Sequence, residues 1–126
     1  MTDTHSKTAL KFHKELSSGL IALVLLSTLN EAASDLYGYE ITKTLSALNP
    51  AAPVKLGAVY PVLRSLAAQG LLSSRIVPSY SGPPRRYYRI TPLGTQMLSE
   101  WLVIWRSSRA FVDAATGAPS NHEHRT

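Results

Sequence analysis

Arginine and tyrosine side chains are concentrated in residues 82–91, which read GPPRRYYRIT. An arginine guanidinium donates a fork of hydrogen bonds that matches phosphate oxygens, and a tyrosine hydroxyl can donate one more. The two prolines stiffen the loop ahead of the arginines, which lowers the entropy cost of ordering it on binding. The stretch therefore has the chemistry of a rigid cationic finger that binds phosphate.

The stretch also has the alternation of a β-strand, in which successive side chains point to opposite faces. Ile90 is expected to face inward, so Tyr88 and Arg86 share its side. We expect Tyr88 to belong to the core, and Arg86 either to brace this inner side through a buried pair or to contact phosphate. The outward residues, for which phosphate contact is expected, are Arg85, Tyr87 and Arg89.

A second cationic surface is predicted on a helix from Leu56 to Gln69, which Gly70 ends as a C-terminal cap. At about 100° per residue, its buried face gathers Val59, Val62, Leu63 and Leu66. The opposite face is thin and has almost no carboxylates, so the helix backbone could approach another surface closely. That face consists of Gly57, Pro61, Arg64, Ser65 and Ala68.

Three further residues border this face. Lys55 stands at the entrance of the helix, and Ala58 follows its first glycine. Tyr60 lies on the flank, where it either donates a hydrogen bond to a phosphate or packs half-buried against the fold. We include all three among the candidate contact residues.

Residues for catalysis or metal binding do not assemble in the sequence. Cysteine is absent, which excludes disulfides, thiol catalysis and cysteine-based zinc sites. The four histidines lie in or near the termini, and His122 and His124 lack a structured third ligand. There is no glycine-rich phosphate loop. We expect no enzyme activity, no cofactor and no metal; the other two histidines are His5 and His13.

Length and composition fit one small globular domain with a polyanionic partner. The chain has 126 residues, is 44% hydrophobic, and carries a formal net charge of +5. It begins without a secretory signal, and its longest apolar run, Leu20 to Leu26, is far shorter than the roughly 20 residues of a membrane span. We expect a cytoplasmic protein with no membrane partner, and a buried helix at this run.

The predicted elements follow the order helix, helix, turn, helix, hairpin, helix. This order describes a winged helix-turn-helix, a mainly α fold with a small β-hairpin, whose third helix enters the DNA major groove. Its hairpin loop, which includes Gly82, is the wing. The expected elements are a flexible N-terminal arm or loose helix lead-in over 1–12, helices over 13–30, 36–48 (with Asp35 as N-cap), 56–69 and 93–115, strands over 71–77 and 85–91, and a disordered tail over 116–126.

The last helix, which Thr91 and Pro92 should start, carries apolar residues at the spacing of a helix pair. Trp101 and Trp105 either pack in a dimer interface or stack on an aromatic ligand between two subunits. The winged-helix domain is expected to span 13–92 and the dimerisation helix 93–115. The expected dimer interface comprises Leu16, Leu20, Leu98, Trp101, Leu102, Trp105 and Val112.

Three segments together resemble the PadR-type transcriptional regulators: LYGYEI at 36–41, LGAVYPVLRSLAAQGLL at 56–72, and GPPRRYYRITPLG at 82–94. The resemblance covers roughly residues 14–113. It implies a homodimeric winged-helix protein, in most members a repressor and in some released by a small aromatic or drug-like ligand. The chain departs from the family at Tyr37, where histidine is usual, and at Ala58, where a small hydroxyl residue is common.

The sequence and its resemblance to this family thus predict a DNA-binding transcriptional regulator, a homodimeric repressor that binds an inverted-repeat operator. Relief of repression by a small aromatic ligand belongs to one of the two interpretations of Trp101 and Trp105, and dimer packing alone is the other. The alternative is a winged helix used only for protein–protein assembly. Clustered cations at Arg64, Arg85 and Arg89 disfavour that alternative, because assembly surfaces usually carry balanced charge.

Overall fold

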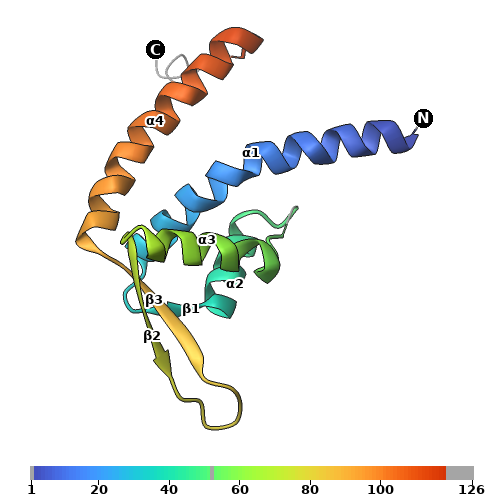
Figure 1. Ribbon diagram of the computed structural model, residues 1–126. Coiled ribbons are helices and arrows are strands. Elements are labelled where there is room, and N and C mark those ends of the chain that lie inside the picture. The colour runs from blue at the N-terminus through green and yellow to red at the C-terminus, as the bar shows by residue number, and fades with distance from the viewer. Residues whose placement is uncertain (1, 52, 119–126) are drawn as a thin grey trace.

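The computed structural model describes residues 2–51 and 53–118. Its four helices and three strands follow the order of a winged helix-turn-helix with a long last helix (Figure 1). The predicted fold class is confirmed. The elements are α1 (Thr2–Glu31), β1 (Leu36–Tyr37), α2 (Gly38–Leu48), α3 (Leu56–Ala68), β2 (Leu72–Val77), β3 (Arg85–Ile90) and α4 (Pro92–Thr116).

The sheet is antiparallel, with the strand order β1-β3-β2. β2 and β3 form the predicted hairpin, in register from Leu72 opposite Ile90 to Val77 opposite Arg85. The short strand β1 was not predicted. It pairs with the other edge of β3, with Leu36 opposite Tyr88, so the connector between α1 and α2 becomes part of the sheet.

The core lies where the second half of α1 meets α2, α3, the sheet and the start of α4. On α3, the predicted inward residues Val59, Leu63 and Leu66 are buried, while Val62 is half-buried at the edge. Tyr88 is buried as predicted. The other buried residues of this cluster are Leu25, Leu26, Leu29, Ile41, Leu45, Leu71, Leu72 and Leu98.

The ends of α3 and α4 have the predicted caps. Gly70 follows α3 with a φ of 79°, a conformation that favours glycine. The Thr91 Oγ1 accepts a hydrogen bond from the backbone N–H of Gly94 at 3.0 Å, and Pro92 occupies the first turn of α4. These caps fix the turn at which the hairpin passes into α4.

Three predicted boundaries differ from the structure. α1 begins at Thr2, so residues 2–12 are helical, which favours the predicted helix lead-in over the flexible arm; they contain neither glycine nor proline to interrupt a helix. α2 begins at Gly38 and has Tyr37 as its N-cap residue, so Asp35 does not cap it. α4 continues to Thr116 and ends at Gly117, with φ 74°; residues 119–126 of the predicted tail lie outside the described residues.

The two long helices extend beyond the winged-helix domain (Figure 1). By length and hydropathy alone, Thr4–Glu31 could cross a membrane. However, Leu25, Leu26 and Leu29 lie in the core, so the second half of α1 is a core helix of the domain. The first half leaves Leu10, Phe12 and Leu16 exposed.

Candidate nucleic-acid interface

The outer face of α3 is exposed, and apart from its one arginine it carries only small side chains. Arg64 is exposed there, and within the described ranges no carboxylate pairs with it. A Cβ built on Gly57 would meet nothing within 4 Å, so the helix backbone is accessible at that point. The predicted face is exposed throughout, at Gly57, Pro61, Arg64, Ser65 and Ala68.

Tyr60 both packs and remains accessible. Its ring lies against Gly38 at the start of α2, where an added Cβ would come within 2.6 Å of the ring, yet the residue is 39% exposed. Its packing role is therefore established, while its predicted phosphate contact stays a prediction.

Lys55 and Ala58 lie on another side of α3. Both line an open groove between the middle of α1 and the α2–α3 pair, together with His13 and Leu20. The backbone carbonyl of Lys55 accepts hydrogen bonds from the N–H groups of Ala58 and Val59 and so starts α3. Their side chains are exposed, and their predicted contact with DNA stays a prediction.

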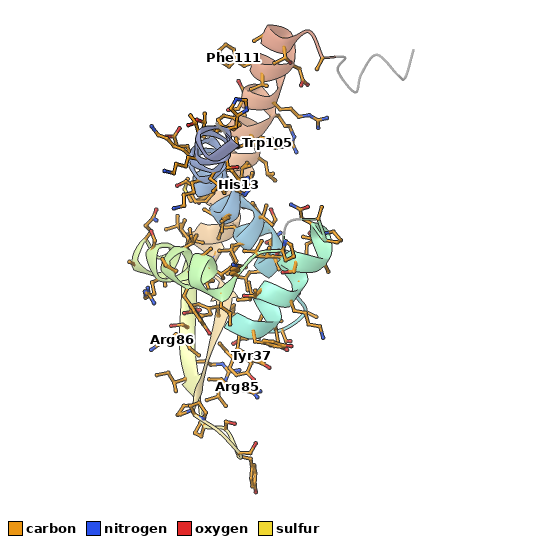
Figure 2. All side chains as sticks on the ribbon, turned by 90° about the vertical axis from the view of Figure 1, so that its right-hand side faces the viewer. His13, Tyr37, Arg85, Arg86, Trp105 and Phe111 are labelled. Atoms are coloured by element: carbon orange, nitrogen blue, oxygen red, sulfur yellow. The ribbon has the colours of Figure 1, made fainter. Side chains whose placement is uncertain are left out.

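The hairpin places one arginine on the side of α3. Figure 2 shows Arg86 on the edge of the hairpin toward α3, with Arg85 and Tyr37 on the other side, below α2. Arg86 is exposed and donates a hydrogen bond to the Ser74 Oγ at 3.0 Å, so the buried pair considered for it is absent among the described residues. Burial raises the pKa of the Tyr88 hydroxyl, and the neighbouring charges of Arg86 and Arg64 oppose that rise. Arg86 and Arg64 therefore both lie near enough to the Tyr88 hydroxyl for their charges to act on it.

The outward arginines of β3 have partners within the chain. The Arg89 Nε lies 2.7 Å from the Asp35 Oδ1, and the Arg85 guanidinium lies over the Tyr37 ring at 4.5 Å. Tyr87, half-buried, contacts the Tyr37 ring with centroids 5.4 Å apart. Arg85 and Arg89 are exposed, as the strand alternation predicts, although each has a partner within the chain. The phosphate contacts expected of Arg85, Tyr87 and Arg89 stay predictions. Gly82 is exposed in the wing loop.

Three residues of this arrangement were not predicted: Asp35, Tyr37 and Arg75, whose Nε binds the Asp35 Oδ2 at 2.9 Å. These two arginines hold the pKa of the Asp35 carboxyl below its usual value. A sequence signal exists in retrospect. Between Ile41 and Ser99 the chain has seven lysines and arginines and no aspartate or glutamate. Glu40 and Asp35 are the last acids before that segment, and a carboxylate there has many cations to bind.

The predicted dimer residues divide into two groups. Leu98 is buried in the core of its own chain, so its assignment to the interface is wrong, and Trp101 and Leu102 pack partly against the same core. Leu20 is half-buried along the groove. Figure 2 shows Trp105 and Phe111 on the part of α4 beyond the winged-helix domain. The exposed apolar residues there are Val103, Ile104, Trp105, Phe111 and Val112, and Leu16 is exposed on α1.

Metal ligands do not gather in the described part of the chain: no group of three or more histidine or acidic side chains could hold an ion there. His122 and His124 lie outside the described residues.

A family model for PadR-like transcriptional regulators matches residues 25–100, which include α2, α3 and the wing. The chain belongs to the PadR-like family. An uncharacterized protein of Lysinibacillus sphaericus is 32% identical over 80 residues, which cover 63% of this chain and 73% of that protein.

Solved structures of PadR-like proteins share the fold. A PadR family transcriptional regulator from Eggerthella lenta is 29% identical, with a TM-score of 0.75, over 92% of this chain and 98% of its own. Bacillus subtilis PadR, solved in complex with operator DNA, is 27% identical, with a TM-score of 0.57, over 67% of this chain and 47% of its own. The match to these PadR-like proteins confirms the resemblance seen in the sequence.

Proposed function

We propose that this PadR-like protein is a cytoplasmic, homodimeric repressor that binds an inverted-repeat operator through α3 and the wing. The observation that carries this proposal is the outer face of α3, where Arg64 is exposed without a carboxylate partner among the described residues. The hairpin places Arg86 on its edge toward α3 (Figure 2). The segment from Ile41 to Ser99 carries +7, while the rest of the chain carries −2. A positive field localised on one domain favours a polyanion such as DNA.

A second copy of the chain would cover the exposed apolar surfaces. The part of α4 beyond the domain is apolar on several sides, and a helix of that kind needs cover on several sides. The groove between α1 and the α2–α3 pair, about 880 Å³ in volume and lined by Leu16, Leu20 and Ile21, offers an apolar seat. We infer that α4 of one subunit packs against α1 of the other, which gives a two-fold dimer and hence a two-fold operator.

An effector site is proposed at Trp105. This indole lies one turn beyond Trp101, is 38% exposed, and would be near its own copy if the α4 helices cross on the two-fold axis. Trp101 packs partly on its own domain, so we assign it a supporting role. A planar aromatic ligand between two indoles would change operator affinity only if it binds more tightly when the α3 helices of the two subunits have one spacing than when they have another.

The test is selection of binding sites from random-sequence duplex DNA by the purified protein. Enrichment of an inverted repeat is expected. In Gly57→Ala, a methyl group would stand between the α3 backbone and the DNA, so weaker binding is expected, with thermal stability unchanged or slightly raised. Recovery of no sequence, together with no measurable DNA binding, would favour the assembly module instead.

A further inference from the structure

Asp35 joins the two strands of the wing to the end of α1. Its two carboxylate oxygens bind one arginine from each strand, Arg75 of β2 at 2.9 Å and Arg89 of β3 at 2.7 Å. The side chain of Asp35 is only 7% exposed, while those of the arginines are 62% and 69% exposed. The arginines therefore cover the carboxylate, and one acid holds two cations in place.

Tyr37, two residues later, makes a second attachment. Its ring supports the Arg85 guanidinium at 4.5 Å, and an arginine over an aromatic face is attracted by the ring quadrupole. The same ring contacts Tyr87, over which the Arg75 guanidinium lies at 5.4 Å. Asp35 and Tyr37 thus contact arginines near the base and near the tip of the hairpin.

The wing needs such support because the rest of it projects away from the domain (Figure 1). A two-stranded hairpin is only marginally stable in water by itself. Ile76 and Tyr80 are exposed, so the far half of the hairpin has little apolar contact with the core. β1 pairs with β3 only at Leu36 and Tyr37. The direction in which the wing projects from α3 therefore depends on the contacts of the connector.

We propose that Asp35 and Tyr37 are the positioning residues of the wing, which set its orientation relative to α3 for operator recognition. This inference rests on the proposed DNA binding by α3 and the wing. It does not require either residue to touch DNA. A wing held in one direction can contact the flank of a DNA site while α3 contacts the centre of that site. A mobile wing would lose conformational entropy when it becomes ordered on the DNA, and this loss would lower the affinity.

The first arm of the test uses no DNA. Hydrogen–deuterium exchange of residues 72–90 is compared among the full-length wild type, Asp35→Asn and Tyr37→Leu. Faster exchange in the hairpin is expected in both variants, with the core of α1 unchanged. Tyr37→Phe keeps the aromatic face and should exchange like the wild type. Asp113→Asn, which alters the charge equally on α4, is the matched control. Hairpin exchange that is unchanged in Asp35→Asn overturns the inference.

The second arm measures affinity for the selected operator and for random-sequence DNA of equal length. Asp35→Asn is expected to weaken operator binding at least about fivefold, a typical lower bound for coupled sites. Its affinity for random DNA should stay within about twofold or rise, because a carboxylate charge is lost. Equal losses on both DNAs, or a mobile hairpin with unchanged operator affinity, overturn the positioning role. If the wild type binds no DNA, the proposed function is refuted. The hydrogen–deuterium exchange experiment uses no DNA, so its result does not depend on that function. If Tyr37→Leu does not fold, Asp35→Asn decides.

Discussion

The Tyr60 ring on α3 lies against Gly38, the first residue of α2. A Cβ at Gly38 would come within 2.6 Å of Cε1 and 2.7 Å of the hydroxyl oxygen of Tyr60. This contact sets how closely α3 approaches α2, and it explains why a glycine stands at this position. The close packing of α2 on α3 in the helix-turn-helix therefore depends on Gly38 and on the half-exposed Tyr60.

Gly38→Ala is expected to lower the free energy of unfolding by about 1–3 kcal/mol, the usual effect of overpacking a tight contact. Urea denaturation measures this change. Gly57→Ala is the matched control, since its added Cβ meets nothing within 4 Å, and it should leave stability unchanged or slightly raised. The double variant Gly38→Ala, Tyr60→Leu should lose less stability than the sum of its single changes. Full additivity would contradict the contact.

Asp35 makes stability depend on acid pH. Because Arg75 and Arg89 hold the pKa of the folded-state carboxyl below its ordinary value of 3.8, their pairing stabilises the fold above about pH 4. That contribution is lost as the pH falls through the lower pKa of the folded state. Asp35→Asn should therefore be less stable than the wild type at pH 6, and the difference should shrink toward pH 2. Thermal melts across that range measure it, and a constant difference would show that Asp35 acts only by shape.

Much of the DNA-binding domain could be predicted because its turns have strong local signals. Gly70, the prolines before Arg85, and the Thr91-Pro92 pair mark the ends of α3, β3 and α4 within a few residues. β1 could not be predicted in this way. It has two residues, and it forms only because Leu36 meets Tyr88, about fifty residues later.

The predicted N-cap role of Asp35 was wrong because the contacts of its side chain are also with residues distant in the sequence. An aspartate just before an apolar periodic segment is typical of an N-cap, and the local sequence contains nothing against it. Its actual partners, Arg75 and Arg89, lie 40 and 54 residues away. Leu98 shows the converse limit: periodicity identifies an apolar face of α4, but it cannot say whether that face meets its own domain or a second subunit.

Dimerisation through α4 can be tested with charges at exposed apolar positions. Phe111 is 76% and Val112 54% exposed, so a charge at either should leave the fold of one chain intact. Phe111→Glu and Val112→Glu are each expected to shift the mass in sedimentation from twice 13.7 kDa toward 13.7 kDa. Ser99→Glu, an exposed polar position of the same helix, should remain dimeric. Dimers that persist in both charged variants would place the interface elsewhere.

The proposed effector site predicts a saturable change in tryptophan fluorescence. Planar aromatic cations and phenolic acids are titrated into the wild type and Trp105→Phe, with loss of operator binding measured in parallel. Stacking between indoles gains about 0.5–1.5 kcal/mol beyond area burial, so quenching should saturate in the wild type and weaken in the variant. If no such compound gives saturation in the wild type while Trp105→Phe remains dimeric, Trp105 serves packing alone.

The salt dependence of operator binding tests most directly the claim that α3 and the wing bind the DNA backbone. If each subunit neutralises roughly three to five phosphates, the slope of log K against log salt concentration should lie between about −5 and −9 per dimer. Arg64→Ala should weaken binding and make the slope shallower by about one to two per dimer. Arg106→Ala, which removes the same charge from α4, should change neither. A slope near zero, or equal effects of Arg64→Ala and Arg106→Ala, would contradict the account.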